Sequence, residues 1–419
     1  MIDATTSLPE FFDPAVIEDP FDWYREALAR GPVARIAGGT VQMVLSHALV
    51  SEAAGRPQDF SSDFGALMRG NQVADPEIAA IEAEGWPTVD TMLTADPPRH
   101  TRFRKLVNLA FSMPRVNALE GSIRQIVDGL IDTMLERGTV EFVHDFAVPL
   151  PVAVIAGQIG MENDVALVKR WSDAFADRLG GMASREREVE ATRLIVEYQH
   201  FAKAQIDARR RDGRGGQRGP DDLLSAIVNA RSEGEAPLDD AEIMSVLQQL
   251  MVAGNETTTS TLAGGLLLLI RHPDQLAKVR ANPALIPNMV EEMLRLLSPV
   301  GGLWRIATRD TELGGVPVTR GEMLMLRFAA ANRDPAVFPD PDHFDVERKN
   351  ARVHLAFGRG IHMCVGNMLA RKELAVAFER LLARCDRFEL PAGANDFAHV
   401  PNKLLRGLAA LHVRAVPKA

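Results

Sequence analysis

The chain has little cysteine and no long apolar segment. Only two of its 419 residues are cysteines, Cys364 and Cys385, which excludes a disulfide framework and any metal site that needs four thiolates. The longest strongly apolar run, residues 262–270, is far shorter than the roughly 18–20 residues that span a bilayer. The first residues carry no basic region followed by an apolar stretch, as a signal peptide would. We therefore expect a cytoplasmic protein that does not enter a membrane.

Basic charge is also in short supply. The chain has 47 Lys and Arg residues against 56 Asp and Glu, a net charge of −9, so we expect no interaction with nucleic acid. Hydrophobic residues make up 46% and charged residues 25% of the chain, which is ordinary for a globular protein. No internal repeat and no low-complexity linker interrupts it.

Apolar residues recur at helical spacing along most of the sequence. Short strand patterns separated by turns occur in the C-terminal third, at 311–318 and 406–413. Nothing alternates strand and helix as a parallel sheet requires. We predict a mainly α protein with small β-sheets (α+β), forming a single domain over residues 1–419. The expected helices are 118–136, 164–178, 185–211, 239–270, 274–281 and 287–297.

Residues 357–366, Phe-Gly-Arg-Gly-Ile-His-Met-Cys-Val-Gly, form a glycine-rich loop that brings Cys364 to the start of a predicted helix. Unpaired N–H groups and the helix dipole favour a thiolate there. Four interpretations compete. In the first, Cys364 is a small buried hydrophobic residue, as we expect of Cys385. In the second, Cys364 is a nucleophile with His362 as its base, although two residues so close on a loop have poor geometry for this. In the third, the loop is a nucleotide-binding fingerprint, although Met363 stands where the third glycine should be. In the fourth, Cys364 is a thiolate ligand to haem iron.

The residue types favour the haem ligand. Gly358 and Gly360 permit a tight backbone and the close approach of a flat ring. Gly366 leaves room over the first helical turn, Phe357 offers an aromatic face, and His362 can hydrogen-bond a carboxylate at the edge of the ring.

The loop resembles the haem-binding signature of the cytochrome P450 family, Phe-Gly-x-Gly-x-His-x-Cys-x-Gly. Six such positions in order would arise by chance in this chain on the order of one time in a million. The resemblance covers nearly the whole chain and is closest to the soluble bacterial members. It implies a triangular helical domain with a long central helix over the haem. It also implies haem b (iron protoporphyrin IX) as cofactor, with Cys364 as the axial thiolate and metal ligand.

A weak spot lies in the middle of the longest expected helix. Residues 253–259, Ala-Gly-Asn-Glu-Thr-Thr-Thr, favour helix poorly, and a threonine hydroxyl can bond a carbonyl one turn back and bend the helix. An irregular helix without chemistry is the alternative. The resemblance makes Glu256 and Thr257 the catalytic acid–alcohol pair, which delivers protons to the distal side of the haem during oxygen activation.

Two further motifs carry polar residues. Glu292 and Arg295 match the family's Glu-x-x-Arg, and side chains at i and i+3 on a helix can form an ion pair. A surface pair is the alternative for this motif alone. His343 lies in a segment that supplies a third polar partner in the family, where many members carry arginine.

Three basic residues are candidates for binding the haem propionates. His100 and Arg104 share a helical face at i and i+4, after the helix-start signal at 96–98. The resemblance assigns this pair, and Arg305, to the propionates. A surface charge is the alternative for each residue taken alone.

By the same resemblance, substrate would contact apolar positions on the long helix, after the Glu-x-x-Arg helix, in the stretch 67–93 and near the C-terminus. Gly301 and Gly302 would leave space for it. These residue types predict a hydrophobic substrate, terpenoid, steroid-like or aromatic, although each residue alone can be core packing. The candidates are Ala253, Gly254, Val300, Leu303 and Leu404.

No nicotinamide or flavin fingerprint occurs in the sequence. Electrons must therefore come from another protein, and we expect a ferredoxin-type donor that is reduced by a separate reductase. The ferredoxin would contact Arg359 and Arg371. We expect the enzyme itself to be a monomer. The expected activity is a monooxygenase that inserts one atom of O₂ into a C–H bond. A peroxide-driven enzyme is an alternative, but peroxide brings its own protons and would not need the acid–alcohol pair. A non-catalytic haem-binding sensor is the other alternative.

Overall fold

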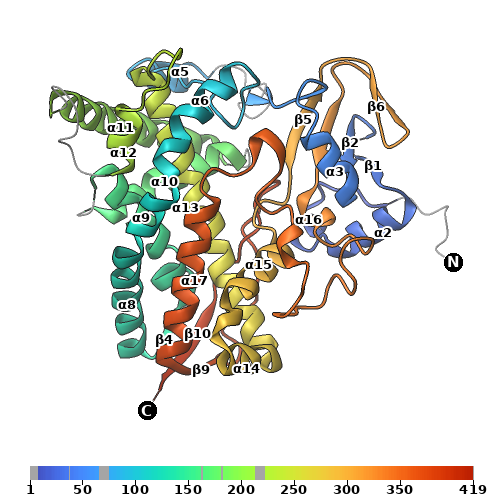
Figure 1. The fold of residues 1–419 in the computed structure, drawn as a ribbon, viewed down its shortest axis with the longest axis vertical. Coiled ribbons are helices and arrows are strands. Elements are labelled where there is room, and N and C mark those ends of the chain that lie inside the picture. The colour runs from blue at the N-terminus through green and yellow to red at the C-terminus, as the bar shows by residue number, and fades with distance from the viewer. Residues whose placement is uncertain are drawn as a thin grey trace. The chain divides into compact units, whose positions relative to one another are not determined.

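Helices make up most of the computed structural model (Figure 1), which describes residues 8–36, 38–65, 75–161, 164–180, 183–212 and 222–418. The first half contains α1 (Pro14–Glu18), α2 (Phe21–Arg30), α3 (His47–Ala54), α5 (Pro76–Glu82), α6 (Arg99–Val107), η1 (Asn108–Phe111), α7 (Met113–Ala118), α8 (Glu120–Arg137), the π-helix η2 (Val143–Ala147), α9 (Pro149–Ile159), α10 (Val165–Gly180) and α11 (Arg185–Asp212). The second half contains α12 (Leu223–Val228), α13 (Asp240–Arg271), α14 (Pro273–Ala281), η3 (Pro283–Leu285), α15 (Ile286–Leu297), α16 (Phe328–Ala331), η4 (Ala351–Val353), η5 (Gly360–His362) and α17 (Asn367–Arg384).

The strands form three small sheets. A five-stranded sheet has the order β1-β2-β8-β5-β3, in which only β2 and β8 run parallel. A three-stranded sheet has the order β4-β10-β9, and β6 and β7 form a hairpin. The strands are β1 (Val33–Ile36), β2 (Val41–Val44), β3 (Phe60–Ser61), β4 (Thr139–Glu141), β5 (Leu303–Ala307), β6 (Thr311–Leu313), β7 (Val316–Val318), β8 (Met323–Leu326), β9 (Cys385–Glu389) and β10 (His412–Pro417).

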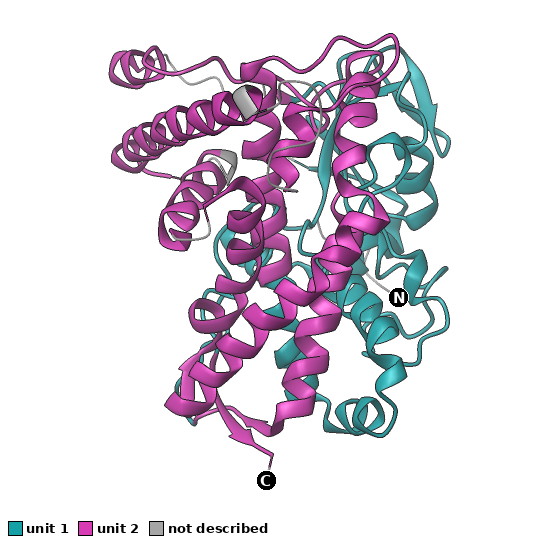
Figure 2. Cartoon of the chain, turned by 60° about the vertical axis from the view of Figure 1, so that its left-hand side comes forward, with its two compact units in different colours: residues 1–64, 260–364, 392–411 teal, residues 65–259, 365–391, 412–419 magenta. Residues whose placement is uncertain are grey.

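The chain divides into two compact units, which Figure 2 colours separately. Unit 1 comprises residues 1–64, 260–364 and 392–411 and contains the five-stranded sheet and the β6–β7 hairpin. Unit 2 comprises residues 65–259, 365–391 and 412–419 and contains most of the helices and the sheet of β4, β9 and β10. A single domain over residues 1–419 stays a prediction.

Each unit has its own apolar core. In unit 2 the core residues come mainly from α6, α9, α10, α11, α12 and the first half of α13, with Trp171 among the largest side chains that are fully buried. In unit 1, residues of the five-stranded sheet pack with α3 and α16. Burying the apolar face of each helix provides the main stabilisation, as it does for most helices in globular proteins.

The longest helix, α13, begins with reciprocal capping. The backbone N–H of Glu242 donates to Asp239 at 2.8 Å, and the N–H of Asp239 donates to Glu242 at 3.0 Å. These bonds satisfy two of the N–H groups that a helix start leaves free. From there α13 runs for 32 residues without interruption, and Pro273 follows two residues after its end.

The fold agrees with the class predicted from sequence, and the expected helices agree to within one or two residues. One strand prediction is wrong. The apolar pattern at 406–413 predicts a strand there, but β10 begins at His412 and continues to Pro417. None of the helices in the described part of the chain is long and apolar enough to cross a membrane.

Candidate functional site

The loop that carries Cys364 is held tightly within unit 1. Gly358 and Gly360 have φ angles of 67° and 70°, which side chains other than glycine rarely adopt. A Cβ atom on Gly360 would lie only 2.4 Å from the carbonyl oxygen of Ala54 in α3. The N–H of Cys364 donates to the carbonyl of Phe357 at 2.8 Å, and Cys364 itself is half-buried. The backbone therefore presents this thiol at a fixed point, whereas Cys385 is buried at the start of β9.

The sequence neighbours of Cys364 that we expect to contact the haem belong to both units. In unit 1, His362 ends η5 and is half-buried, and the ring of Phe357 lies 5.7 Å from the ring of His354. In unit 2, Gly366 precedes α17, and a Cβ atom there would meet only Phe111, at 3.9 Å. Space is therefore left beside Gly366.

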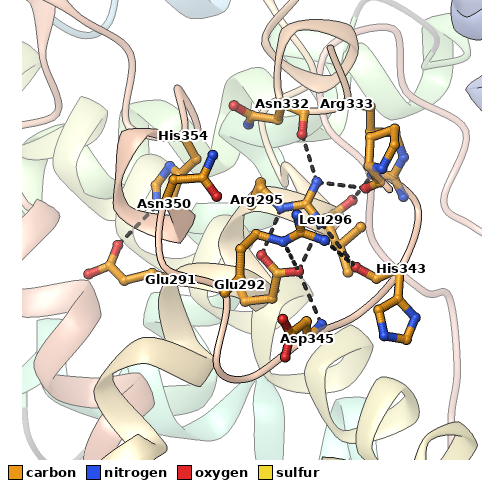
Figure 3. A network of polar contacts seen from close by, with 12 residues as sticks. Glu291, Glu292, Arg295, Leu296, Asn332, Arg333, His343, Asp345, Asn350 and His354 are labelled. Atoms are coloured by element: carbon orange, nitrogen blue, oxygen red, sulfur yellow. Dashed lines mark hydrogen bonds and ion pairs between the residues drawn. The ribbon is translucent and has the colours of Figure 1, made fainter. Parts of the chain in front are cut away.

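Glu292 and Arg295 lie at the centre of a buried network in unit 1 (Figure 3). Both side chains have no exposed surface, and Arg295 donates to both carboxylate oxygens of Glu292, at 2.7 and 2.8 Å. Arg295 also donates to the carbonyls of Asn332 and Pro341, at 2.8 and 2.7 Å. A buried pair of this kind is stable only because its remaining polar atoms are also satisfied.

The third side chain of this network is Arg348, which our sequence analysis did not select. Its Nε lies 2.9 Å from Glu292, and its side chain is 7% exposed. The expectation for His343 needs correction, because His343 contributes its backbone carbonyl, which accepts from Arg348 at 2.9 Å and from Arg295 at 3.3 Å. Arg348 follows His343 by five residues in the same segment. That spacing has no helical or strand periodicity, so no local pattern marked it.

Residues 253–259 of α13 combine an open face with a set of polar contacts within unit 2. Ala253 and Gly254 are exposed although Val252 and Asn255 on either side are buried, and a Cβ atom on Gly254 would have no described atom within 4 Å. The hydroxyl of Thr257 donates to the carbonyl of Ala253 at 2.7 Å. This is the hydrogen bond to a carbonyl one turn earlier in the helix that the sequence predicted for a threonine.

Glu256 lies on the same turn in a poorly hydrated position. Burial raises the pKa of the Glu256 carboxyl, the nearby charges of Asp173 and Asp177 act in the same direction, and Lys169 opposes them. The side-chain amide of Asn255 lies 3.4 Å from its carboxyl. A carboxyl with a raised pKa can carry a proton at neutral pH, which suits a proton donor.

The basic candidates are placed on regular elements. His100 lies on α6 with 3% of its surface exposed, and Arg104 lies one turn later on the same helix in unit 2. In unit 1, Arg305 lies on β5, is 4% exposed and donates to the carbonyl of Trp304 at 2.7 Å. The guanidinium groups of Arg104 and Arg305 and the imidazole of His100 are side chains that can bind carboxylates.

Three of the apolar candidates come together in unit 1. Val300 pairs with Leu405 in an isolated β-bridge next to Leu404, and Leu303 begins β5. Val300 and Leu303 are half-buried against the sheet core, whereas Leu404 is 7% exposed. Ala253 and Gly254 belong to unit 2, and Leu67 lies outside the described residues.

The expectation that Gly301 and Gly302 leave space for substrate is wrong. A Cβ atom on Gly301 would lie 2.7 Å from the guanidinium of Arg327, and one on Gly302 would lie 2.5 Å from the carbonyl oxygen of Leu326. Arg327 also donates to the hydroxyl of Tyr24 at 2.5 Å. These glycines therefore admit a buried arginine and the neighbouring strand.

Comparison with known proteins identifies the family. The cytochrome P450 family model matches residues 167–399. The chain is 36% identical over 422 residues to the cytochrome P450 monooxygenase PikC of Streptomyces venezuelae, and the match covers 98% of this chain and 95% of that one. The chain belongs to the cytochrome P450 family.

Other relatives of this cytochrome P450 are bacterial as well. It is 37% identical over 397 residues to the steroid C26-monooxygenase of Mycobacterium tuberculosis strain H37Rv, covering 94% of this chain and 93% of that one. The solved structure of CYP109Q5 from Chondromyces apiculatus matches with a TM-score of 0.84 and 32% identity over 98% of both chains. CYP109E1 from Bacillus megaterium, solved with testosterone, matches with a TM-score of 0.80 and 30% identity, over 94% of this chain and 99% of that one. The protein is thus an enzyme of the monooxygenase type.

The family and fold imply a haem bound through a cysteine thiolate. Each unit contains residues that suit such a group. Unit 1 offers the half-buried thiol of Cys364 on a rigid loop and the guanidinium of Arg305. Unit 2 offers the space beside Gly366 and the polar side chains of His100 and Arg104.

Proposed function

We propose that this cytochrome P450 hydroxylates a hydrophobic small molecule of steroid-like size, using O₂ and two electrons from a ferredoxin-type donor with a separate reductase. One observation carries the proposal: on a single turn of α13, an open face at Gly254 adjoins the Thr257 hydroxyl and the half-buried acid Glu256. An apolar surface for the substrate and a route for protons then lie within one helical turn of each other. The relatives named steroid C26-monooxygenase and the structure with testosterone support the substrate class. Terpenoid and aromatic compounds are the alternative substrate classes, and the titration described below includes them.

We assign the haem b to Cys364 as its axial thiolate. Phe357 and Gly366 would lie against the ring, and His100, Arg104, Arg305 and His362 would hold its carboxylates. When bound, such a haem supplies the activation of O₂, and its thiolate donates electron density to the iron. The remaining cysteine, Cys385, is buried in β9, so it is a poor candidate for the same role.

The protein's own groups move the protons. Burial raises the pKa of the Glu256 carboxyl, which favours its protonated form. Glu256 would pass that proton through water to the Thr257 hydroxyl, which holds the water in place on the open face of α13. Ala253, Gly254, Val300, Leu303 and Leu404 would contact the substrate and exclude bulk water. Substitution of Glu256 or Thr257 should impair turnover by a monooxygenase, whereas a peroxide-driven enzyme would not need this pair.

The thiolate assignment predicts the effect of Cys364→Ser. The purified variant should lose the red-shifted absorption of the reduced carbon-monoxide complex, because an alcohol cannot replace the thiolate as an electron donor to iron. Cys385→Ser is the matched control and should keep the absorption. If Cys364→Ser kept it, another residue would ligate the iron.

The substrate class is tested by titrating steroids, terpenoids and aromatic compounds and recording the shift of the haem absorption that accompanies loss of an iron-bound water. Steroids are expected to give the shift and, with ferredoxin, reductase and O₂, hydroxylated products. If only smaller aromatic compounds gave the absorption shift, the proposed steroid-like substrate class would be wrong and an aromatic substrate would take its place.

A further inference from the structure

The turn of α13 that carries Glu256 and Thr257 is held by side-chain contacts to three other elements of unit 2. The amide of Asn255 donates to the hydroxyl of Ser172 in α10 at 3.0 Å. The hydroxyl of Thr259 donates to the carbonyl of Ala147 at the end of η2 at 3.1 Å. The third contact is a hydrogen bond between Thr258 and Glu373 of α17. The hydroxyl of Thr257 donates to the carbonyl of Ala253 in its own helix.

The contact with α17 is unusual in its chemistry. Glu373 is 3% exposed and Thr258 is 2% exposed, so an acid and an alcohol meet inside the core. Burial raises the pKa of Glu373 to about 8, although the hydrogen bond with Thr258 opposes the change. An ionised carboxylate in such a place would be poorly solvated. At neutral pH the side chain is therefore mainly a neutral carboxylic acid.

Four charged side chains of α17 form ion pairs with α8. On α17 itself, Lys372 pairs with Glu120, and Glu379, Arg380 and Arg384 pair with other residues of α8. The burial of Glu373 and the Thr258 hydroxyl are the causes that shift its pKa. The other charged residues on these elements are Arg371, Lys372, Glu379, Arg380 and Arg384 of α17, Glu120, Arg124, Asp128, Asp132, Glu136 and Arg137 of α8, Arg115 of α7, Asp386, Arg387 and Glu389 of β9, and Asp240, Glu242, Glu256 and Arg271 of α13.

We propose that Glu373 is a positioning residue for the reaction: as a neutral acid it holds Thr258, and thereby fixes the turn of α13 that presents Glu256 and Thr257. Of the three contacts, only this one contains a group that titrates near neutral pH. Ionisation of Glu373 places a poorly solvated charge in the core and draws water toward the carboxylate, and the turn that carries the Thr257 hydroxyl loses its fixed position. The proposal rests on the proposed role of Glu256 and Thr257 in proton delivery.

The test compares product formed per electron consumed, at pH 7 and pH 9, in the complete system with ferredoxin, reductase and a substrate. With a pKa of about 8, the neutral fraction of Glu373 falls roughly tenfold over this range. The coupling of the wild-type enzyme should fall by up to about the same factor, with hydrogen peroxide formed instead of product. Thr257→Ala provides the reference for full loss of coupling.

Three variants separate positioning from other roles. Glu373→Gln keeps a neutral group that can bond Thr258 and should stay coupled at both pH values. Glu373→Leu and Thr258→Val remove the contact from either side and should be uncoupled already at pH 7. If Glu373→Gln were as uncoupled as Glu373→Leu, Glu373 would act by exchanging a proton, and the positioning role would be overturned. Coupling of the wild-type enzyme that does not change between pH 7 and pH 9 would also overturn it.

A second measurement does not depend on turnover. Because the folded protein binds the Glu373 proton more tightly than the unfolded chain, this group stabilises the fold most at pH below the ordinary value of Glu, and the stabilisation is lost as pH rises toward about 8. Denaturant unfolding followed by circular dichroism should therefore show that Glu373→Gln removes part of the fall in stability between pH 5 and pH 9. Equal pH dependence in both proteins would refute the buried neutral acid. A wild-type enzyme that gives no product, yet shows this difference, would instead refute the proposed function.

Discussion

Removing a single side chain from the Glu292 network should cost more stability than removing a surface side chain. Arg295 and Arg348 both contact the one carboxylate of Glu292, and all three side chains are buried. Removing one cation leaves the polar atoms of the others partly unpaired in the core. Such an uncompensated group is far more costly than the loss of an exposed ion pair.

Arg348→Ala should therefore destabilise the protein by about 3–5 kcal/mol, measured by denaturant unfolding. Lys278→Ala is the matched control, because Lys278 pairs with Glu347 beside Arg348 but is well exposed, and it should change stability little. Equal effects of the two substitutions would show that Arg348 is not part of the buried network.

Single residues also show which parts of the candidate site a local sequence pattern can select. Cys364, Glu256 and Thr257 stand in contiguous motifs, so their pattern could be read directly. Arg348 and Glu373 became notable only through burial against segments far away in sequence. In the sequence, Glu373 is one charge among several on a helix, and nothing local separates it from Glu379, which is exposed. Long-range packing decides which charges are buried.

Among the elements, the helices were predictable because their apolar periodicity is a local property. The 28 residues of α11 and the 32 residues of α13 begin and end within one residue of the expected positions. The strand β10 was misplaced because residues 406–413 alternate as a strand would, while the partner strands β4 and β9 select residues 412–417. Pairing partners, which are not visible in a local pattern, fix where a strand lies.

The loop before α17 gives a test at the scale of an element. Gly358→Ala and Gly360→Ala both place a side chain at positive φ, which costs roughly 1–2 kcal/mol. At Gly358 the nearest atom to an added Cβ is 3.8 Å away, whereas at Gly360 the Ala54 carbonyl is 2.4 Å away. Gly360→Ala should therefore be the more destabilising change in denaturant unfolding, and it should also lower the fraction of protein purified with haem. A milder effect than that of Gly358→Ala would contradict the close packing of the loop on α3.

At the scale of the whole molecule, net charge shapes the encounter with an electron donor. The chain carries a net charge of −9, so the proposed ferredoxin, if acidic, would approach a protein of the same overall sign. Local basic positions then decide how the two proteins meet. Arg359 is exposed beside the Cys364 loop, and Arg371 is half-buried on α17.

Reversing both charges in the double variant Arg359→Glu/Arg371→Glu should slow the first electron transfer on the order of tenfold at low ionic strength. The rate is measured by stopped-flow reduction under carbon monoxide. Arg320→Glu, an exposed change in the turn between β7 and β8, is the matched control and should have little effect. Equal rates in all three proteins would exclude these two arginines from the docking face.

Gly254 bears on how this enzyme balances stability against its chemistry. Alanine there would meet no described atom, and in the middle of a helix it would be more favourable than glycine by roughly 0.8–1.0 kcal/mol. Packing thus gives no reason to keep the glycine, and helix propensity gives a reason to lose it. A protein selected for stability alone would accept the extra methyl group. The missing side chain leaves empty volume at this one position, so under the proposed function the size of residue 254 is a direct means of engineering which molecules the enzyme admits.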